Sequence, residues 1–271
     1  MIEPGHALIL GAVEGLTEFL PVSSTGHLIL AAHWLGLEGE AVKTFEVVIQ
    51  AGALGAVLAL YRRSVASMWR GLRGQDADGR RLLINLFVSF LPAAIVGLAL
   101  HKAIKATLFS LGPVIAALAL GGVVMIGIDR WLRSRARPAR ELASLTIRDA
   151  LLIGLAQCLS LWPGTSRAMV TLVAGLLVGL PATAAAEYSF LLALPTLGAA
   201  TMFDAVRGGG ELLDHAGGLS VACGFAMAAV VAALAITGLV RYLTRRGLAP
   251  FGWYRLAMAL VVWLLIGRSG G

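Results

Sequence analysis

The stretch that decides the fold is ALILGAVEGLTEFLPVSSTGH at residues 7–27, where glutamates, a proline and a run of hydroxyls interrupt an apolar segment. The same pattern returns in ALLIGLAQCLSLWPGTSRAM at residues 150–169. Several positions correspond in chemistry, namely Glu14 with Gln157 and, after a gap of one residue, Pro21 with Pro163, Ser23 with Thr165 and Ser24 with Ser166. A duplicated polar hairpin in a hydrophobic chain is typical of a site built between two repeats.

The composition indicates an integral membrane protein. Of the 271 residues, 58% are hydrophobic and 14% are charged, and the mean hydropathy is +0.85, far above what a soluble core requires. The net charge of +7 comes from arginines that mostly lie between apolar runs, a pattern that reports topology. No motif for nucleic-acid binding accompanies them, so we expect no nucleic-acid partner.

The apolar runs predict an all-α fold with six transmembrane helices and two re-entrant helical hairpins. The six predicted spans cover residues 45–61, 82–100, 108–128, 185–204, 218–240 and 251–267. Four shorter segments, broken in pairs by proline and hydroxyl residues, are the predicted half-helices of the hairpins, at 5–20, 24–36, 149–161 and 166–179. Irregular backbone at membrane depth is tolerable only where protein or water satisfies it.

Arginine-rich loops are expected on the cytoplasmic side of the membrane. They cover residues 62–81, 130–148 and 241–246. The loops around Lys102 and around Glu211 and Asp214 are poor in arginine and are expected outside.

This orientation predicts an inverted-topology repeat within one membrane domain, residues 1–271. The two halves, about 1–132 and 149–267, each contain a hairpin followed by three spans, and the hairpins enter from opposite faces. Their tips then meet near the midplane. The alternative is that each hairpin is a single kinked helix that crosses the membrane.

Glu14 and Glu18 are four residues apart and share one face of a predicted helix. Because an ionised group at membrane depth is costly, two carboxylates on one face indicate a partner or a water-filled cavity. The alternative is a pair of interfacial glutamates on a shallow helix.

The sequence VSSTGH follows Pro21 and combines hydroxyls with an imidazole. Ser23, Ser24 and Thr25 are suited to cap the next half-helix, and His27 lies one turn later. Capping explains one hydroxyl, so Ser24 and His27 are candidate catalytic groups.

The second tip, PGTSRAMVT, has the composition of an anion site. Gly164, Thr165 and Ser166 precede an apolar half-helix whose N-terminus offers free N–H groups, and Arg167 adds a two-pronged donor for phosphate oxygens. Thr171, four residues later, is expected to point at the same ligand. The alternative is that Arg167 reaches the membrane interface.

Two further polar residues, Glu46 and Gln50, lie near the start of a predicted span, and Glu187 occupies a place similar to that of Glu46 in the second half. Each is either part of the site or an interfacial residue.

EGLTEFLPVSSTGH at 14–27, KTFEVVIQAG at 43–52 and PGTSRAMVT at 163–171 resemble the undecaprenyl pyrophosphate phosphatase family of the bacitracin-resistance type. Glu14 and Glu18 match the family's glutamate motif. The family's second motif, Pro-Gly-x-Ser-Arg-Ser-x-x-Thr, is matched at Pro163, Gly164, Ser166, Arg167 and Thr171, whereas Ala168 replaces its second serine.

The resemblance implies hydrolysis of the terminal phosphate of a C55 polyprenyl pyrophosphate, which regenerates the monophosphate carrier of bacterial cell-wall synthesis and confers bacitracin resistance. It also implies a bacterial plasma-membrane location, a site open toward the outer face, and a divalent cation, Mg²⁺ or Ca²⁺. The working hypothesis assigns this cation to Glu14 and Glu18.

The working hypothesis assigns catalysis and substrate binding to separate groups of residues. The catalytic set is Glu14, Glu18, Ser24, His27 and Arg167. The substrate-binding set is Ser23, Thr25, Gly164, Thr165, Ser166, Thr171, Glu46 and Gln50. Ser24, His27 or water is the nucleophile, and if it is Ser24 or His27, the other of the two or Glu18 acts as the base.

A lipid-phosphate transporter or flippase is the rival function, because inverted repeats with broken helices are also the architecture of secondary carriers. Small-residue runs, Gly121-Gly122 and Ala228 to Ala233, are compatible with close helix contacts within the chain or with a homodimer.

Overall fold

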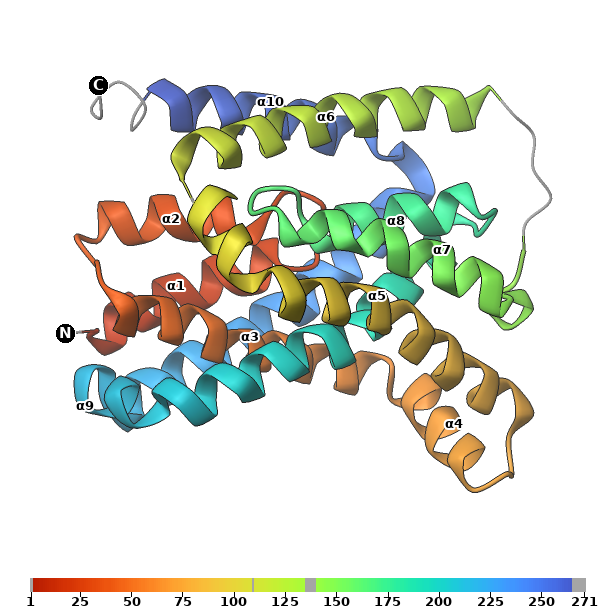
Figure 1. Ribbon diagram of the computed structural model, residues 1–271, viewed down its shortest axis with the longest axis horizontal. Coiled ribbons are helices and arrows are strands. Elements are labelled where there is room, and N and C mark those ends of the chain that lie inside the picture. The colour runs from red at the N-terminus through yellow and green to blue at the C-terminus, as the bar shows by residue number, and fades with distance from the viewer. Residues whose placement is uncertain (1, 109, 135–139, 265–271) are drawn as a thin grey trace.

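The computed structural model describes residues 2–108, 110–134 and 140–264, without the side chains at 101, 102, 105, 111 and 204–214; this part of the chain is helical and contains no strand (Figure 1). The helices are α1 Pro4–Thr17, α2 Ser24–Trp34, α3 Glu40–Leu60, α4 Arg62–Leu72, α5 Ala77–Leu108, α6 Leu111–Arg133, α7 Ile147–Gln157, α8 Arg167–Leu177, α9 Ala182–Arg246 and α10 Ala249–Val262, with short 3₁₀ turns η1 Leu142–Ser144 and η2 Cys158–Leu161.

Four helical segments in the described residues are long and apolar enough to cross a membrane. They are Glu40–Leu60, Ala77–Leu100, Gly112–Arg133 and His215–Arg246. The predicted span 185–204 lies in the first limb of α9, and the span 251–267 begins in the shorter helix α10, with residues 265–267 outside the described part. The chain is a multi-pass helical membrane protein.

Both predicted hairpins are broken at their prolines. α1 and α2 flank the first break, and α7 and α8 flank the second. Ser23 and Ser166 occupy equivalent places there, since each precedes a half-helix with a positive φ, 73° and 72°. The sequence alignment, which paired Ser24 with Ser166, was therefore wrong by one residue, because the shared left-handed backbone pairs Ser23 with Ser166 and Ser24 with Arg167.

Each broken pair packs against a helix from the other half of the chain. α1 contacts α9 and α7 contacts α5. A Cβ built on Gly11 would lie 2.4 Å from the carbonyl oxygen of Gly224, and one on Gly154 would lie 2.6 Å from that of Ser89. Glycine is therefore needed at the same position of α1 and α7 for the backbones to approach.

The small-residue runs also pack inside the chain. Gly15 of α1 faces the backbone of Ala228 and Ala232, and a Cβ on Gly121 of α6 would lie 2.4 Å from a guanidinium nitrogen of Arg255. These runs therefore serve contacts between helices of one molecule.

Two predicted loops contain helix. The 62–81 segment includes α4, which projects beside α5 at one end of the molecule and exposes Trp69 (Figure 1). The backbone N–H of Gly79 and the Ser67 hydroxyl donate to Asp76 in the turn after α4 and lower the pKa of its carboxyl. Around Glu211 the backbone is helical, and α9 turns instead at Gly217, whose φ is 69°.

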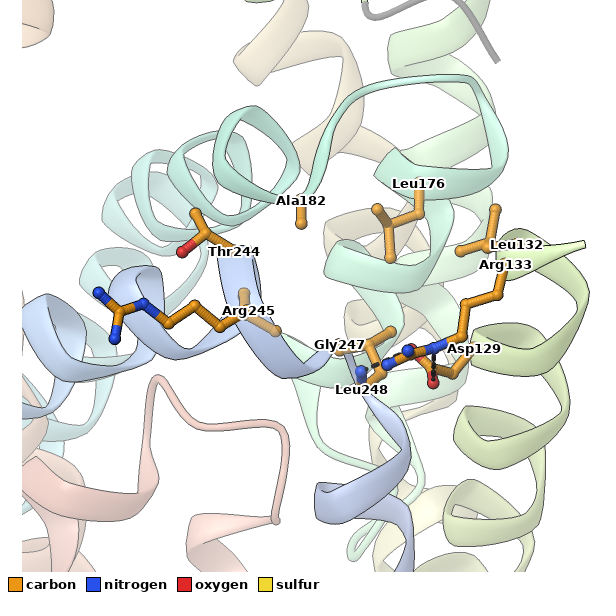
Figure 2. A pocket seen from close by; sticks show the side chains of 10 residues that line it. Asp129, Leu132, Arg133, Leu176, Ala182, Thr244, Arg245, Gly247 and Leu248 are labelled. Carbon is orange, nitrogen blue, oxygen red and sulfur yellow. Dashed lines mark hydrogen bonds and ion pairs between the residues drawn. The ribbon is translucent and has the colours of Figure 1, made fainter. Parts of the chain in front are cut away.

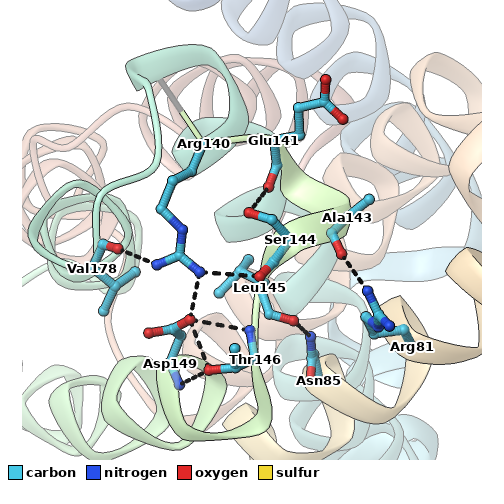
Figure 3. Close-up of polar contacts among 10 residues, drawn as sticks. All are labelled: Arg81, Asn85, Arg140, Glu141, Ala143, Ser144, Leu145, Thr146, Asp149 and Val178. Atoms are coloured by element: carbon cyan, nitrogen blue, oxygen red, sulfur yellow. Dashed lines mark hydrogen bonds and ion pairs between the residues drawn. The ribbon is translucent and has the colours of Figure 1, made fainter. Parts of the chain in front are cut away.

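A polar network fixes the start of α7 (Figure 3). The Thr146 hydroxyl accepts from the N–H of Asp149, and the Asp149 carboxylate accepts from the N–H of Thr146, which forms a capping box. Arg140 donates to Asp149 and to the carbonyl oxygen of Val178 at the end of α8. The two half-helices of the second hairpin are thereby tied together at the end away from their tip.

Candidate active site

The two hairpin tips meet through one carboxylate. Arg167, the first residue of α8, donates from Nη2 to Oε1 of Glu18 at 3.0 Å, and both side chains are buried. The hydroxyl of Ser24, the first residue of α2, donates to Oε2 of the same glutamate at 2.6 Å. Glu18 therefore accepts from a hydroxyl with one oxygen and from a guanidinium with the other, and its partner Arg167 lies 149 positions away in the sequence.

The Arg167 guanidinium is held in a fixed direction. Its Nη1 donates to the carbonyl oxygen of Ser189 at 2.9 Å, and its Cζ lies 5.7 Å from the centre of the Phe19 ring. Nε has no hydrogen-bond partner among the described residues although it is buried. An unpaired buried donor on a guanidinium is suited to a ligand oxygen.

The hydroxyls of the second tip take part in the local structure. Ser166 accepts from the N–H of Met169 and caps α8. Thr171 is fully buried, and its hydroxyl lies 2.9 Å from the carbonyl oxygen of Arg167 and 2.6 Å from the Ser189 hydroxyl. Thr171, expected to face the ligand, thus supports the backbone of Arg167 in this structure.

Glu14 lies on α1, four residues before Glu18. It is fully buried, and neither carboxylate oxygen has a hydrogen-bond partner there. Glu18 and Glu46 lie close enough to repel it electrostatically, and Arg167 attracts it. A buried carboxylate without a donor is unfavourable unless a proton or a cation compensates its charge.

His27 lies on α2 but is not bonded to Ser24 in the described structure. Its Nδ1 is 2.8 Å from the carbonyl oxygen of Ser23, and its Nε2 is 2.6 Å from the hydroxyl of Tyr254 on α10. The sequence hypothesis allowed His27 to act as base for Ser24. In the structure the side chain hydrogen-bonded to the Ser24 hydroxyl is Glu18.

Arg255, next to Tyr254, holds the two tips together. Its side chain is fully buried, and it donates to carbonyl oxygens of Gly164 at 2.8 Å and Pro21 at 3.5 Å. Two further bonds reach Ala117 and Leu118 of α6. The sequence analysis missed Arg255, although a charged residue inside an apolar run was the available signal.

The remaining predicted residues lie at the margins of this site. Ser23 and Thr165 are buried in the two tips and Gly164 has a φ of 92°, whereas Thr25 is exposed. Glu46 and Gln50 are half-buried on α3.

Glu187, the counterpart of Glu46, is separate from this site. It accepts from Ser64 at the start of α4.

A cavity of about 310 Å³ lies elsewhere, where α6, α8 and α9 end and α10 begins (Figure 2). None of the predicted site residues lines it. Asp129 on its wall pairs with Arg133 and accepts from the backbone N–H of Leu248, so it anchors the start of α10.

Comparison with known proteins shows the family of the chain. The sequence model of the family described as Bacitracin resistance protein BacA matches residues 7–261. A protein from Sorangium cellulosum named undecaprenyl-diphosphatase is 55% identical over 95% of this chain and 85% of its own length. A protein from Methylococcus capsulatus named undecaprenyl-diphosphatase is 48% identical over 95% of this chain and 93% of its own length. A protein from Rhodospirillum rubrum named undecaprenyl-diphosphatase 2 is 46% identical over 94% of this chain and 92% of its own length. The chain therefore belongs to the BacA family of bacitracin resistance proteins.

Proposed function

We propose that this chain is an undecaprenyl-diphosphatase that removes the terminal phosphate of undecaprenyl pyrophosphate and so recycles the lipid carrier for peptidoglycan synthesis. The observation that carries the proposal is Glu18, which accepts from Ser24 and pairs with Arg167 across the two tips. The relatives named undecaprenyl-diphosphatase support the same reaction. A transporter has no use for a hydroxyl bonded to a buried carboxylate beside an anion site.

In the proposed first step, Ser24 Oγ attacks the terminal phosphorus while its proton passes to Glu18. The anhydride P–O bond breaks, and the proton on Glu18 passes to the departing lipid monophosphate. Arg167 keeps its orientation and donates from its unpaired Nε to a phosphoryl oxygen, which stabilises the charge that develops there. Water then cleaves the phosphoserine, with Glu18 as base, and Ser24 regains its proton.

Glu14 and Glu18 fit a divalent cation, Mg²⁺ or Ca²⁺. The unpaired buried oxygens of Glu14 beside a second carboxylate are the donors such hard cations prefer. No group of three or more His, Cys, Asp or Glu side chains suited to a metal occurs in the described residues, so substrate and water oxygens would complete the shell. The cation would neutralise charge on the pyrophosphate. Chelation by EDTA is expected to lower activity, and added Mg²⁺ or Ca²⁺ to restore it.

We also propose the inverted-topology repeat, with six spans and two re-entrant hairpins, in the bacterial inner membrane with the site open to the outer side. The equivalent glycine contacts of α1 and α7 support the repeat. In a variant without Cys158 and Cys223, Thr25→Cys is expected to react with an impermeant maleimide from outside. Gln75→Cys is expected to react only after the inner face is exposed, and the reverse pattern would contradict this orientation.

Phosphate release by purified protein in detergent tests the function, because transport alone releases no phosphate. Ser24→Ala, Glu18→Gln and Arg167→Ala are each expected to abolish release. The matched control is Ser160→Ala in the second hairpin, whose hydroxyl donates to the carbonyl oxygen of Gln157. Wild-type protein that binds the lipid without releasing phosphate would favour the flippase.

Trapping distinguishes a covalent intermediate from direct attack by water. With substrate labelled in its terminal phosphate, acid quenching is expected to leave label on Ser24 in wild type and none in Ser24→Ala. Label on His27 would assign the nucleophile to the imidazole, and it is sought after alkaline quenching because phosphohistidine hydrolyses in acid.

A further inference from the structure

Tyr254 of α10 makes a close contact with the first hairpin that the reaction above does not use. Its hydroxyl oxygen lies 2.6 Å from Nε2 of His27. The two rings are stacked, with centroids 5.6 Å apart and planes 3° from parallel. Both a hydrogen bond and a ring contact therefore fix the imidazole to α10.

The partners of His27 determine its tautomer. The Ser23 carbonyl oxygen can only accept, so Nδ1 carries the hydrogen and donates to it. In the neutral imidazole Nε2 is then the acceptor, and the Tyr254 hydroxyl donates to it. Both nitrogens of His27 are occupied, which leaves neither of them facing Ser24.

The hydrogen bonds that run from Tyr254 through His27 end at Ser23, whose backbone conformation is unusual. Ser23 has a φ of 73° and a ψ of 97°, a conformation that non-glycine residues rarely adopt and that persists only where the surroundings hold it. The Ser23 side chain makes no capping bond that would hold it. The bond from His27 to the Ser23 carbonyl is thus a restraint on the residue that precedes Ser24.

α10 is itself anchored firmly enough to act as a support. Asp129 accepts from the N–H of Leu248 at its start, and Gly247 before it has a φ of 75°. One residue after Tyr254, Arg255 donates to the carbonyl oxygens of Pro21 and Gly164. Two successive residues of α10 therefore hold the turn and the start of α2.

We propose that Tyr254 is a positioning residue that acts through His27 to hold the backbone of Ser23, and thereby directs the Ser24 hydroxyl to Glu18. The inference rests on the proposed phosphatase function. It assigns His27 to orientation of the nucleophile, while Glu18 takes the proton.

Tyr254→Phe tests this directly, because it keeps the stacked ring and removes only the hydroxyl. We expect kcat to fall about tenfold, the typical effect of one lost hydrogen bond, with KM changed less than about twofold. The matched control is Tyr242→Phe on α9, whose ring packs edge-on against Phe251 of α10. An unchanged kcat in Tyr254→Phe would overturn the proposal.

A double-mutant cycle shows whether Tyr254 acts through His27. His27→Asn keeps an N–H donor at the position of Nδ1 and removes Nε2. In that background Tyr254→Phe is expected to lower kcat less than about twofold further. A second tenfold loss would mean that Tyr254 acts on the substrate independently, which contradicts the proposal.

A spectroscopic measurement separates this inference from the proposed function. The ring ¹⁵N signals of His27 are identified among those of the five histidines because they disappear in His27→Asn. Their chemical shifts are then compared in wild type and Tyr254→Phe. We expect a protonated Nδ1 in both, and an Nε2 shift that moves toward the free imine value when the hydroxyl is removed. A protonated Nε2 in neutral wild-type His27 would overturn the inference even if the enzyme is active, whereas inactive wild type with the expected shifts would overturn only the function.

Discussion

Gly11→Ala is expected to disable the enzyme without contacting the reacting groups. The new Cβ would lie 2.4 Å from the carbonyl oxygen of Gly224 and 3.1 Å from its carbonyl carbon, whereas ordinary contact begins at 3.4 Å. α1 must therefore move away from α9 by about 1 Å, the difference between 3.4 and 2.4 Å. Overpacking of this kind costs about 1–3 kcal/mol, partly offset by the ~1 kcal/mol helix preference of alanine over glycine.

The displacement reaches the site because Glu14 lies on α1 and Glu18 directly follows the last residue of α1. A shift of about 1 Å separates Glu18 from Ser24 or from Arg167, and misplacement on that scale costs about 100-fold in rate. We expect kcat/KM for phosphate release to fall about 100-fold, with a free energy of unfolding lower by at most ~2 kcal/mol.

Gly55→Ala in α3 is the control for this change. It is also inside a helix, but a Cβ there meets nothing within 4 Å, so we expect unchanged activity and stability equal or higher by ~1 kcal/mol. Thermal unfolding and phosphate release in detergent measure both quantities. If Gly11→Ala is as active and as stable as Gly55→Ala, the close approach of α1 to α9 is not what positions the carboxylates.

Three further substitutions probe the supports of the site. Arg167→Lys replaces a guanidinium that donates to both Glu18 and the Ser189 carbonyl oxygen by a single ammonium group, so kcat/KM is expected to fall about 10³-fold. Retention of a tenth of the activity would contradict the need for two donor groups. Arg255→Met leaves buried carbonyls of both tips without a donor, and we expect a loss of about 3 kcal/mol in thermal or denaturant unfolding; unchanged stability would show that the tips hold without it. Asp129→Ala removes the acceptor at the start of α10, which is expected to cost about 1 kcal/mol in stability and to leave KM unchanged. A raised KM would show that Asp129 contributes to substrate binding.

Most of the helices could be predicted because their signals are local. Apolar runs between arginine-rich segments predicted the positions of the long helices, and Pro21 and Pro163 marked the two breaks. α4 was missed because its arginines resemble those of a loop, although Val65, Trp69 and Leu72 have helical spacing. The turn at Gly217 was missed because the residue types around Glu211 do not distinguish a helix from a loop.

The sequence predicted several residues that contact one another at the tips, but it did not predict all of their hydrogen-bond partners. The duplicated tips led to Glu18, Ser24 and Arg167, which the structure places in contact. The partner of His27 could not be found, because Tyr254 is 227 positions away and nothing in the sequence relates the two. The correct pairing of Ser23 with Ser166 depends on a backbone angle, which residue identity does not reveal.

The exchange of packing partners between the halves has a consequence for biosynthesis. α1 leaves the ribosome long before the stretch of α9 that contains Gly224, so its glycine face has no permanent neighbour while the intervening helices are being made. During that interval Glu14 is not yet enclosed, and its carboxylate requires water or the translocon to solvate it. α1 therefore reaches its final position only after nearly the whole chain has been synthesised, and the contacts of Glu18 with Ser24 and Arg167 are completed among the last events of insertion.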